Sequence, residues 1–223
     1  MISFAWSLVL LIAPATLQAQ AKAVGYGATP VIDNERVTVW DITLTPGEPG
    51  SFVRHDNDFV TMFLVGGKIR TTDPNGRETV VLRRAGDAVF GREGTEGKDE
   101  VISNTPARLI VVELKNSLIT PLINNTGYPA AFPRPGSKKV LDNDRVVVWD
   151  YTWTLGVPIP THYHDKDVVL VYMDNGSIKS TTPNGESVVN DDKFGMVRFN
   201  KRDRVHFEEL VKGEQSAIIL ELK

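Results

Sequence analysis

The sequence predicts an all-β protein made of two tandem barrel or sandwich domains. The observations behind this prediction are an internal repeat, short runs rich in β-branched and aromatic residues, and turn dipeptides between those runs. No stretch combines a sustained helical period with capping residues, so a long helix is not expected.

The internal repeat covers most of the chain. Residues 31–76 align with residues 140–185 without a gap, and 22 of the 46 aligned positions are identical. The similarity resumes between residues 107–115 and 215–223. Two units are too few for a stacked repeat array, so the pattern indicates a duplicated domain.

Within each unit, runs typical of strands alternate with turn signals. In the second unit the runs are RVVVWDYTWTL, VVLVYM, GMVRF and SAIILEL. Asn-Gly pairs at 75–76, 175–176 and 184–185, and Gly-Gly at 66–67, separate such runs and are typical of tight hairpins.

These patterns divide the chain into four segments. A signal peptide is expected at 1–21, a first domain at 22–115, a linker at 116–139 and a second domain at 140–223. The linker holds four of the 13 prolines, which interrupt regular structure.

The first segment is typical of an export signal. It is apolar and uncharged from Phe4 to Leu17, and Ala19 and Ala21 suit the −3 and −1 positions of a signal-peptidase site. The alternative is a retained anchor, but the run is shorter than the about 20 apolar residues that span a membrane. We therefore expect cleavage after Ala21 and a periplasmic or secreted protein without a membrane attachment.

Composition excludes several classes of function. The chain has 25 Lys and Arg against 28 Asp and Glu, a net charge of −3, and no basic run, so nucleic acid is not an expected partner. It has no cysteine, which excludes disulfides, thiolate metal sites and cysteine nucleophiles.

Three of the four histidines lie in the second unit. His162 and His164 are one residue apart in a predicted strand, so their side chains point to the same side and could bind one metal ion. Glu208 follows His206 by two residues and faces the same way on a strand, as a fourth ligand or a general base.

The second unit resembles the cupin family, whose jelly-roll barrels carry two sequence motifs. In the first motif, Gly156, His162, His164 and Gly176 have the family spacing, and Val169 stands at the glutamate position. In the second motif, a glycine and a histidine keep the spacing, while the motif's proline, second glycine and asparagine are replaced. The retained pair is Gly195 and His206, and the replacements are Lys201, Asp203 and Leu210.

The resemblance covers both units and implies a bicupin, with two tandem jelly-roll β-barrels. It places His206 on the strand facing His162 and His164, which implies one divalent ion of Fe, Mn, Zn, Cu or Ni. With Val169 beside the ion, its +2 charge stays uncompensated and favours a small anionic chelating substrate. This ligand set resembles the three-histidine iron cupins, which cleave thiols, β-diketones or gentisate-type diols with dioxygen, rather than oxalate-decarboxylase-like or isomerase-like cupins.

The first unit lacks this set of histidines. The positions that match His162, His164, Val169 and His206 are Val53, His55, Val60 and Lys98, or Gly97 if the gap moves by one. One histidine cannot hold a transition metal, so His55 is interpreted as a relic or a salt-bridged surface residue, and this half as structural or as a site for something other than metal.

Other polar and aromatic residues are assigned less specific roles. Asp165 and Asp167 are expected at a solvated barrel mouth, and Arg198 faces solvent or meets an anionic substrate. The aromatic residues of 149–153 share a strand face and are expected in the core or between the barrels rather than in a ligand-stacking wall, because Trp40 matches one of them in the metal-less unit.

Three functions stay open at this point. The first is an exported metal-dependent oxidoreductase of the dioxygenase type, and the second is a noncatalytic bicupin that binds a metal or small molecule. The third is a structural or interaction module with a decayed site. The oligomeric state cannot be read from the sequence.

Overall fold

The computed structural model describes residues 29–116 and 119–223, and in these two ranges the regular structure consists of strands only. The prediction of an all-β fold is confirmed. The expected signal peptide at 1–21 lies outside the described residues. No helix in the described part of the chain is long and apolar enough to span a membrane.

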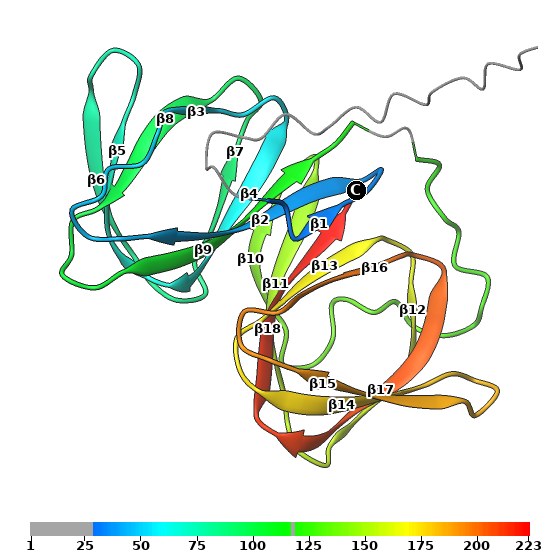
Figure 1. Cartoon of the computed structure of the whole chain (residues 1–223). Helices are drawn as coiled ribbons and strands as arrows, with labels where there is room; N and C mark the ends of the chain where they lie inside the picture. Colours follow the sequence, from blue (N-terminus) through cyan, green and yellow to red (C-terminus); the bar gives the residue numbers. More distant parts are fainter. Residues whose placement is uncertain (1–28, 117–118) are drawn as a thin grey trace, which may run out of the picture.

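The two units form two separate groups of strands (Figure 1). The first unit contains β1 (Ile32–Asp33), β2 (Val37–Leu44), β3 (Val53–Arg54), β4 (Asp58–Val65), β5 (Gly67–Thr72), β6 (Glu78–Arg83), β7 (Ala88–Gly91), β8 (Glu96–Val101) and β9 (Ala107–Leu114). The second contains β10 (Lys138–Asp142), β11 (Val146–Trp153), β12 (Pro158–His164), β13 (Val168–Tyr172), β14 (Gly176–Thr181), β15 (Ser187–Asp192), β16 (Val197–Asn200), β17 (Arg204–Gly213) and β18 (Gln215–Leu222).

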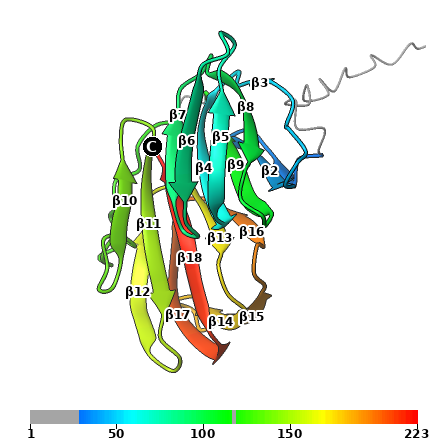
Figure 2. The same cartoon turned by 90° about the vertical axis from the view of Figure 1, so that its left-hand side faces the viewer.

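The strands of the two units pair in the same order. Each unit has a five-stranded sheet, β1-β2-β9-β4-β7 in the first and β10-β11-β18-β13-β16 in the second. Each also has a four-stranded sheet, β3-β8-β5-β6 or β12-β17-β14-β15. The two sheets of a unit form a jelly-roll barrel, as expected, and the two barrels are stacked in the view of Figure 2.

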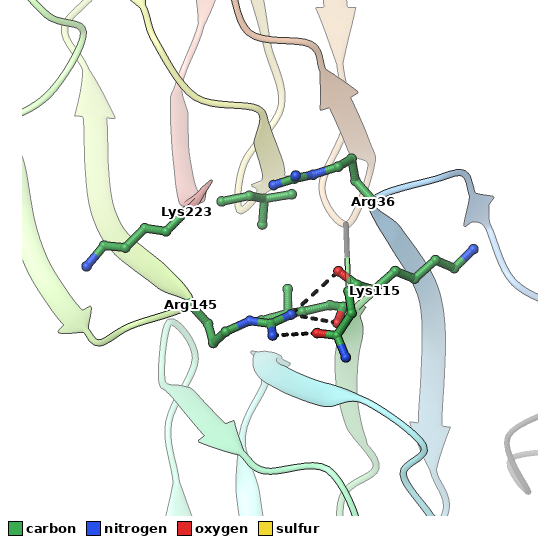
Figure 3. A pocket seen from close by; sticks show the side chains of 7 residues that line it. Arg36, Lys115, Arg145 and Lys223 are labelled. Atoms are coloured by element: carbon green, nitrogen blue, oxygen red, sulfur yellow. Dashed lines mark hydrogen bonds between the residues drawn. The ribbon is translucent and has the colours of Figure 1, made fainter. Parts of the chain in front are cut away.

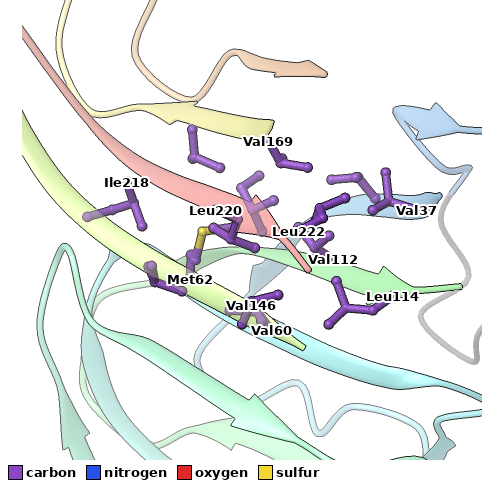
Figure 4. Packing of buried hydrophobic residues seen from close by; sticks show 14 of the residues in the cluster. Val37, Val60, Met62, Val112, Leu114, Val146, Val169, Ile218, Leu220 and Leu222 are labelled. Atoms are coloured by element: carbon purple, nitrogen blue, oxygen red, sulfur yellow. The ribbon is translucent and has the colours of Figure 1, made fainter. Parts of the chain in front are cut away.

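The two five-stranded sheets pack against each other through one apolar cluster (Figure 4). In β13, Val169 and Val171 belong to this cluster between the barrels, whereas Val168, Leu170 and Tyr172 pack inside the second barrel. Both faces of the central strands of these sheets are therefore buried. This explains why these strands are continuous apolar runs rather than alternating patterns.

The expectation that Val169 lies beside the metal ion is wrong. Its side chain is fully buried against the first barrel. The cupin motif allows three or four residues between the second histidine and the glutamate, and Val168 is the one whose side chain faces the barrel interior. A shift of one residue along a strand turns a side chain to the opposite face, so the motif count alone selected the wrong valine.

The same kind of ion pair occurs twice at the edge of this interface. In one pair the first barrel supplies the arginine and the second the aspartate, and in the other pair the reverse holds. Arg36 Nε lies 3.2 Å from Asp167 Oδ2, and at the matching positions Arg145 lies 3.7 Å from Asp58. Arg36 and Asp167 are both buried, so Asp167 is not at a solvated barrel mouth as the sequence suggested.

Two further ion pairs, which are more exposed, also join matching positions of the two barrels. Arg92 pairs with Asp144 at 2.8 Å, and the matching Lys201 pairs with Glu35 at 3.6 Å. The interface is thus formed by matching positions of the two barrels around one apolar cluster.

The linker contacts the second barrel. Tyr163 of β12 and the linker exchange two backbone hydrogen bonds of 2.8 Å, through Ala131 N and Pro129 O. Linker residue Arg134 pairs with Glu208 of β17 at 3.2 Å. β10 begins at Lys138, two residues before the domain start that the repeat suggested.

Candidate metal centre

The three histidines of the second barrel converge in its interior. β12 carries His162 and His164 on one side of the strand, and β17 carries His206 directly opposite His162 in the antiparallel pairing. All three side chains are buried, and one ring nitrogen from each lies within 4.8 Å of the others. The structure therefore brings together the three residues that the sequence proposed as ligands.

Neighbouring groups orient two of the rings. His162 Nδ1 donates to the carbonyl oxygen of Pro160 at 2.9 Å, which directs its Nε2 toward the other rings. His206 Nδ1 is hydrogen-bonded to the Ser180 hydroxyl at 2.8 Å. Such partners fix the ring orientation and tautomer of metal-binding histidines.

The remaining ring nitrogens fit a bound cation. Nε2 of His164 and Nε2 of His206 lie 3.1 Å apart, so two nitrogen lone pairs point to one place unless a proton or a metal ion lies between them. His162 Nε2 is buried and has no hydrogen-bond partner among the described residues. A buried nitrogen without a partner costs about 1–3 kcal/mol, which coordination of a divalent transition metal would remove.

The histidines are in the form that binds metal. Burial lowers the pKa of His162, lowers that of His164 well below its usual value, and lowers that of His206 to about 4, against the opposing charge of Glu208. All three are therefore neutral near pH 7, as imidazole ligands must be.

Glu208 is beside the histidines but is held by another group. Its Oε1 lies 3.5 Å from His206 Nε2, while its Oε2 accepts hydrogen bonds from Arg134 at 3.2 Å and from Trp153 Nε1 at 3.4 Å. Burial alone would raise the pKa of Glu208, but Arg134 and the histidines lower it to about 2. The side chain is thus an ionised carboxylate at the edge of the histidine cluster.

Arg134 is the charged residue beside the histidine cluster that sequence reasoning missed. Its guanidinium lies over the rings of Tyr151, Phe132 and Trp153, at 3.9, 4.5 and 5.5 Å from their centroids. It is the only charged residue between Asn116 and Lys138. An isolated arginine in an otherwise uncharged, proline-rich stretch was the signal that could have found it.

A pocket of about 370 Å³ opens beside this cluster, which is large enough for a small ligand. Its walls include His162, Arg134 and Tyr151, together with prolines from the linker and from β12. Of the three histidines, His162 is the one that lines this pocket, and it shares the wall with the buried positive charge of Arg134.

The backbone before β17 is left-handed at Asp203, the residue that replaces the second glycine of the cupin motif. Asp203 has a φ of 63°, the left-handed region that glycine adopts most readily. Tyr163 Oη donates to Asp203 Oδ1 at 3.1 Å, and Asp203 N donates to the carbonyl oxygen of His164 at 2.8 Å. These bonds hold the turn that leads to His206.

Other predicted residues lie away from the cluster. Arg198 neither faces solvent freely nor meets the pocket, because it pairs with the buried Asp192 at 2.6 Å. Asp165 pairs with Lys166 at 2.7 Å and lies outside the histidine group. The aromatic residues of β11 are buried inside the second barrel rather than between the barrels, and Trp40 occupies the same place in the first.

The first barrel has no matching set of histidines. Val53 pairs with Gly97 as His162 pairs with His206, so Gly97 and not Lys98 takes the third position. One of the sequence interpretations placed His55 at the surface, and this is wrong. It is buried, stacks on Phe59 with ring centroids 3.5 Å apart, and its Nδ1 lies 3.1 Å from Glu113 Oε1.

Solved structures share this architecture. A Cupin 2 conserved barrel domain protein from Leptotrichia buccalis aligns over 87% of this chain and 88% of its own, with 14% identity and a TM-score of 0.54. Oxalate decarboxylase from Bacillus subtilis, described with Mn(II) centres, aligns over 85% of this chain and 69% of its own, with 12% identity and a TM-score of 0.60. The chain has the bicupin fold.

At these identities the likeness to other bicupins shows the fold alone. No protein-family model and no curated protein matches the sequence. The metal-binding character of this bicupin therefore depends on its own three-histidine cluster in the second barrel.

Proposed function

We propose that this bicupin is an exported metal-dependent enzyme of the dioxygenase type that acts on a small anionic chelating substrate. The observation that carries the proposal is the convergence of His162, His164 and His206 beside a pocket whose wall also contains Arg134. A divalent ion held by three imidazoles would supply a Lewis acid with open coordination positions.

The charges around the cluster favour an anion. The three histidines are neutral, and the negative charge of Glu208 is balanced by Arg134 at 3.2 Å. The residues on β13 that face the barrel interior are apolar, so no carboxylate enters from that strand. Binding of a carboxylate, enolate or diketonate would therefore add the negative charge that the site lacks.

Arg134 and Glu208 would then have separate roles. Arg134 is held rigidly by three aromatic rings and can orient an anion that enters the pocket. Glu208 Oε2 is engaged by Arg134 and Trp153, which leaves Oε1 directed to the histidines as a fourth ligand or a proton acceptor.

A second candidate is a noncatalytic bicupin that binds a metal ion or a small molecule. The engagement of Glu208 by Arg134 and Trp153 favours it, because a carboxylate stabilised in its ionised form is a weak proton acceptor. Both candidates use the same three histidines and differ in turnover.

Metal content and oxygen uptake test the proposal. Protein purified from its native compartment should contain one divalent transition metal per chain, and should consume oxygen with one member of a panel of thiol carboxylates, β-diketones and gentisate-type diols. His162→Ala should lose both properties, while His55→Ala should keep them. Stoichiometric metal without turnover of any member would favour the noncatalytic candidate. Absence of metal would contradict the enzyme and leave the second candidate only as a binder of small molecules.

Export is tested separately. The Ala19 and Ala21 pattern predicts a mature chain that begins at Lys22. N-terminal sequencing of the protein from the periplasm or medium should find this residue, and full-length protein in the membrane fraction would contradict export.

A further inference from the structure

A second pocket lies where the two barrels meet, away from the histidine cluster. Its volume is about 380 Å³. Six of its seven lining residues are three pairs of matching positions from the two barrels, and the seventh comes from the start of the linker. The pairs are Arg36 with Arg145, Leu114 with Leu222 and Lys115 with Lys223, and the seventh residue is Asn116.

The wall of this pocket is positive. Four of the lining residues are cations, and none of the described residues in the wall is an Asp or a Glu. Figure 3 shows that the amines of Lys115 and Lys223 point away from the centre, in opposite directions. They contact Asp33 and Asp142, at 2.5 and 2.7 Å.

The two arginines extend into the pocket from opposite barrels (Figure 3). Arg145 donates to Asn116 Oδ1 at 2.7 Å and to the carbonyl oxygen of Leu114 at 2.9 Å. These acceptors are neutral, and its nearest carboxylate, Asp58, is 3.7 Å away. The guanidinium is thus fixed in place while much of its charge is left uncompensated.

Arg36 Nε, unlike the guanidinium of Arg145, is buried without a hydrogen-bond partner among the described residues. Arg36 is deeply buried, since only 8% of its surface is exposed, and Nε faces Asp167 at 3.2 Å without forming a hydrogen bond. Burial lowers the pKa of Arg36, Asp167 opposes this shift, and the positive charges of Arg202 and Arg145 add to it. Two arginines from different barrels therefore repel each other across a common pocket.

We propose that this junction pocket binds a small dianion, such as a phosphate or a dicarboxylate, between Arg36 and Arg145. A planar guanidinium matches the oxygen pairs of phosphate and carboxylate groups, and here one such group comes from each barrel. The ligand would relieve the repulsion between the arginines, and it would stabilise the contact between the barrels because it binds both of them. The site is independent of the three histidines and of the proposed enzyme activity.

Calorimetric titration with inorganic phosphate and with succinate, at low ionic strength and with chloride as the monovalent control, tests the site. Both dianions should bind once per chain and raise the melting temperature, whereas chloride should not. Arg145→Gln should weaken binding at least about tenfold, because it removes one of two charge-assisted contacts. Arg36→Lys keeps the charge beside Asp167 but loses the planar fork, and should weaken binding at least about threefold.

Two control variants distinguish this site from a general effect of surface charge and from binding at the histidine cluster. Arg70→Gln removes a partly exposed arginine that pairs with Glu100 in the first barrel, and should leave binding unchanged. His206→Ala disables the histidine cluster and should also leave it unchanged. The proposal is overturned if neither dianion binds, if Arg145→Gln or Arg36→Lys binds as the unaltered protein does, or if Arg70→Gln weakens binding equally. Loss of binding in His206→Ala would show that the anion binds at the histidine cluster, and this result would also overturn the proposal.

Discussion

The two barrels have the same strand order but different interiors. In the second, three histidines converge, whereas in the first the matching positions are Val53, His55 and Gly97. The apolar residues between the barrels, by contrast, come from both units, and the ion pairs beside them occur at matching positions. The positions that join the barrels were therefore kept in both halves, while the positions that form a site are present in one.

One position holds a glutamate in both barrels, but the glutamate has a different partner in each. Glu113 and Glu221 are both buried at the same place in β9 and β18. Glu113 contacts His55, while Glu221 accepts a hydrogen bond of 2.8 Å from Trp149 Nε1. A matching sequence position thus shows a shared place in the fold but not a shared chemical role.

Removal of one histidine should give the largest difference between the barrels. His206→Ala should abolish retention of a divalent metal, because two imidazoles remain, while His55→Ala should leave the metal content unchanged. Metal analysis of purified variants measures this. Two metals per chain in the unaltered protein, or full retention by His206→Ala, would show that the barrels do not differ as described.

Charges placed between the barrels should affect both units alike. Val169→Glu and Val60→Glu put a carboxylate at matching, fully buried positions of the interface, and each should cost roughly 3–5 kcal/mol of unfolding free energy. Val188→Glu, at an exposed position, should change stability by less than about 0.5 kcal/mol. If Val169→Glu folded normally and bound metal more tightly, this valine would have to face the ion.

Loss of the linker arginine should destabilise only the second barrel. Arg134→Met leaves Glu208 as a buried, unpaired carboxylate and should cost about 3 kcal/mol. The double variant Arg134→Met with Glu208→Gln should recover most of this loss, which denaturant unfolding in a double-mutant cycle measures. The matching acid in the first barrel, Asp99, is only half-buried and accepts a hydrogen bond from Thr71 rather than pairing with an arginine, so Asp99→Asn should have little effect. Additive effects of the two changes would mean that the Arg134–Glu208 pair contributes nothing.

The ion pairs between the barrels should show the smallest difference. Asp167→Asn breaks a buried pair and should cost about 2 kcal/mol. Asp58→Asn breaks longer, more exposed pairs with Arg145 and Arg92 and should cost about 1 kcal/mol. Lys201→Gln removes an exposed pair and should have no measurable effect. Equal costs for the two aspartates would mean that the difference in burial has no energetic consequence.

The sequence predicted the parts of the fold that depend on local pattern. Branched and aromatic runs with Asn-Gly turns indicated strands, and the ungapped repeat indicated two like units. The alternation of strand side chains indicated that His162 and His164 point to the same side. The resemblance to cupins placed His206 on the facing strand.

What could not be predicted depends on contacts between distant segments. The direction of Val169 depends on which of two adjacent residues faces the barrel, and both are valines. Asp167 was expected at a solvated barrel mouth, but it is buried because its partner Arg36 lies on the other barrel. The role of Arg134 depends on how the linker docks, which no periodic pattern encodes.

The exchanged ion pairs have a consequence for how the two barrels can differ in sequence. In this interface, matching residues of the two halves make the same contacts with each other. A two-fold symmetric homodimer has the same geometry, which here lies within a single polypeptide. In a dimer of identical subunits, every substitution alters both sites together. Within one polypeptide that constraint is absent, so one barrel can hold three histidines while the other holds His55 alone at the matching positions.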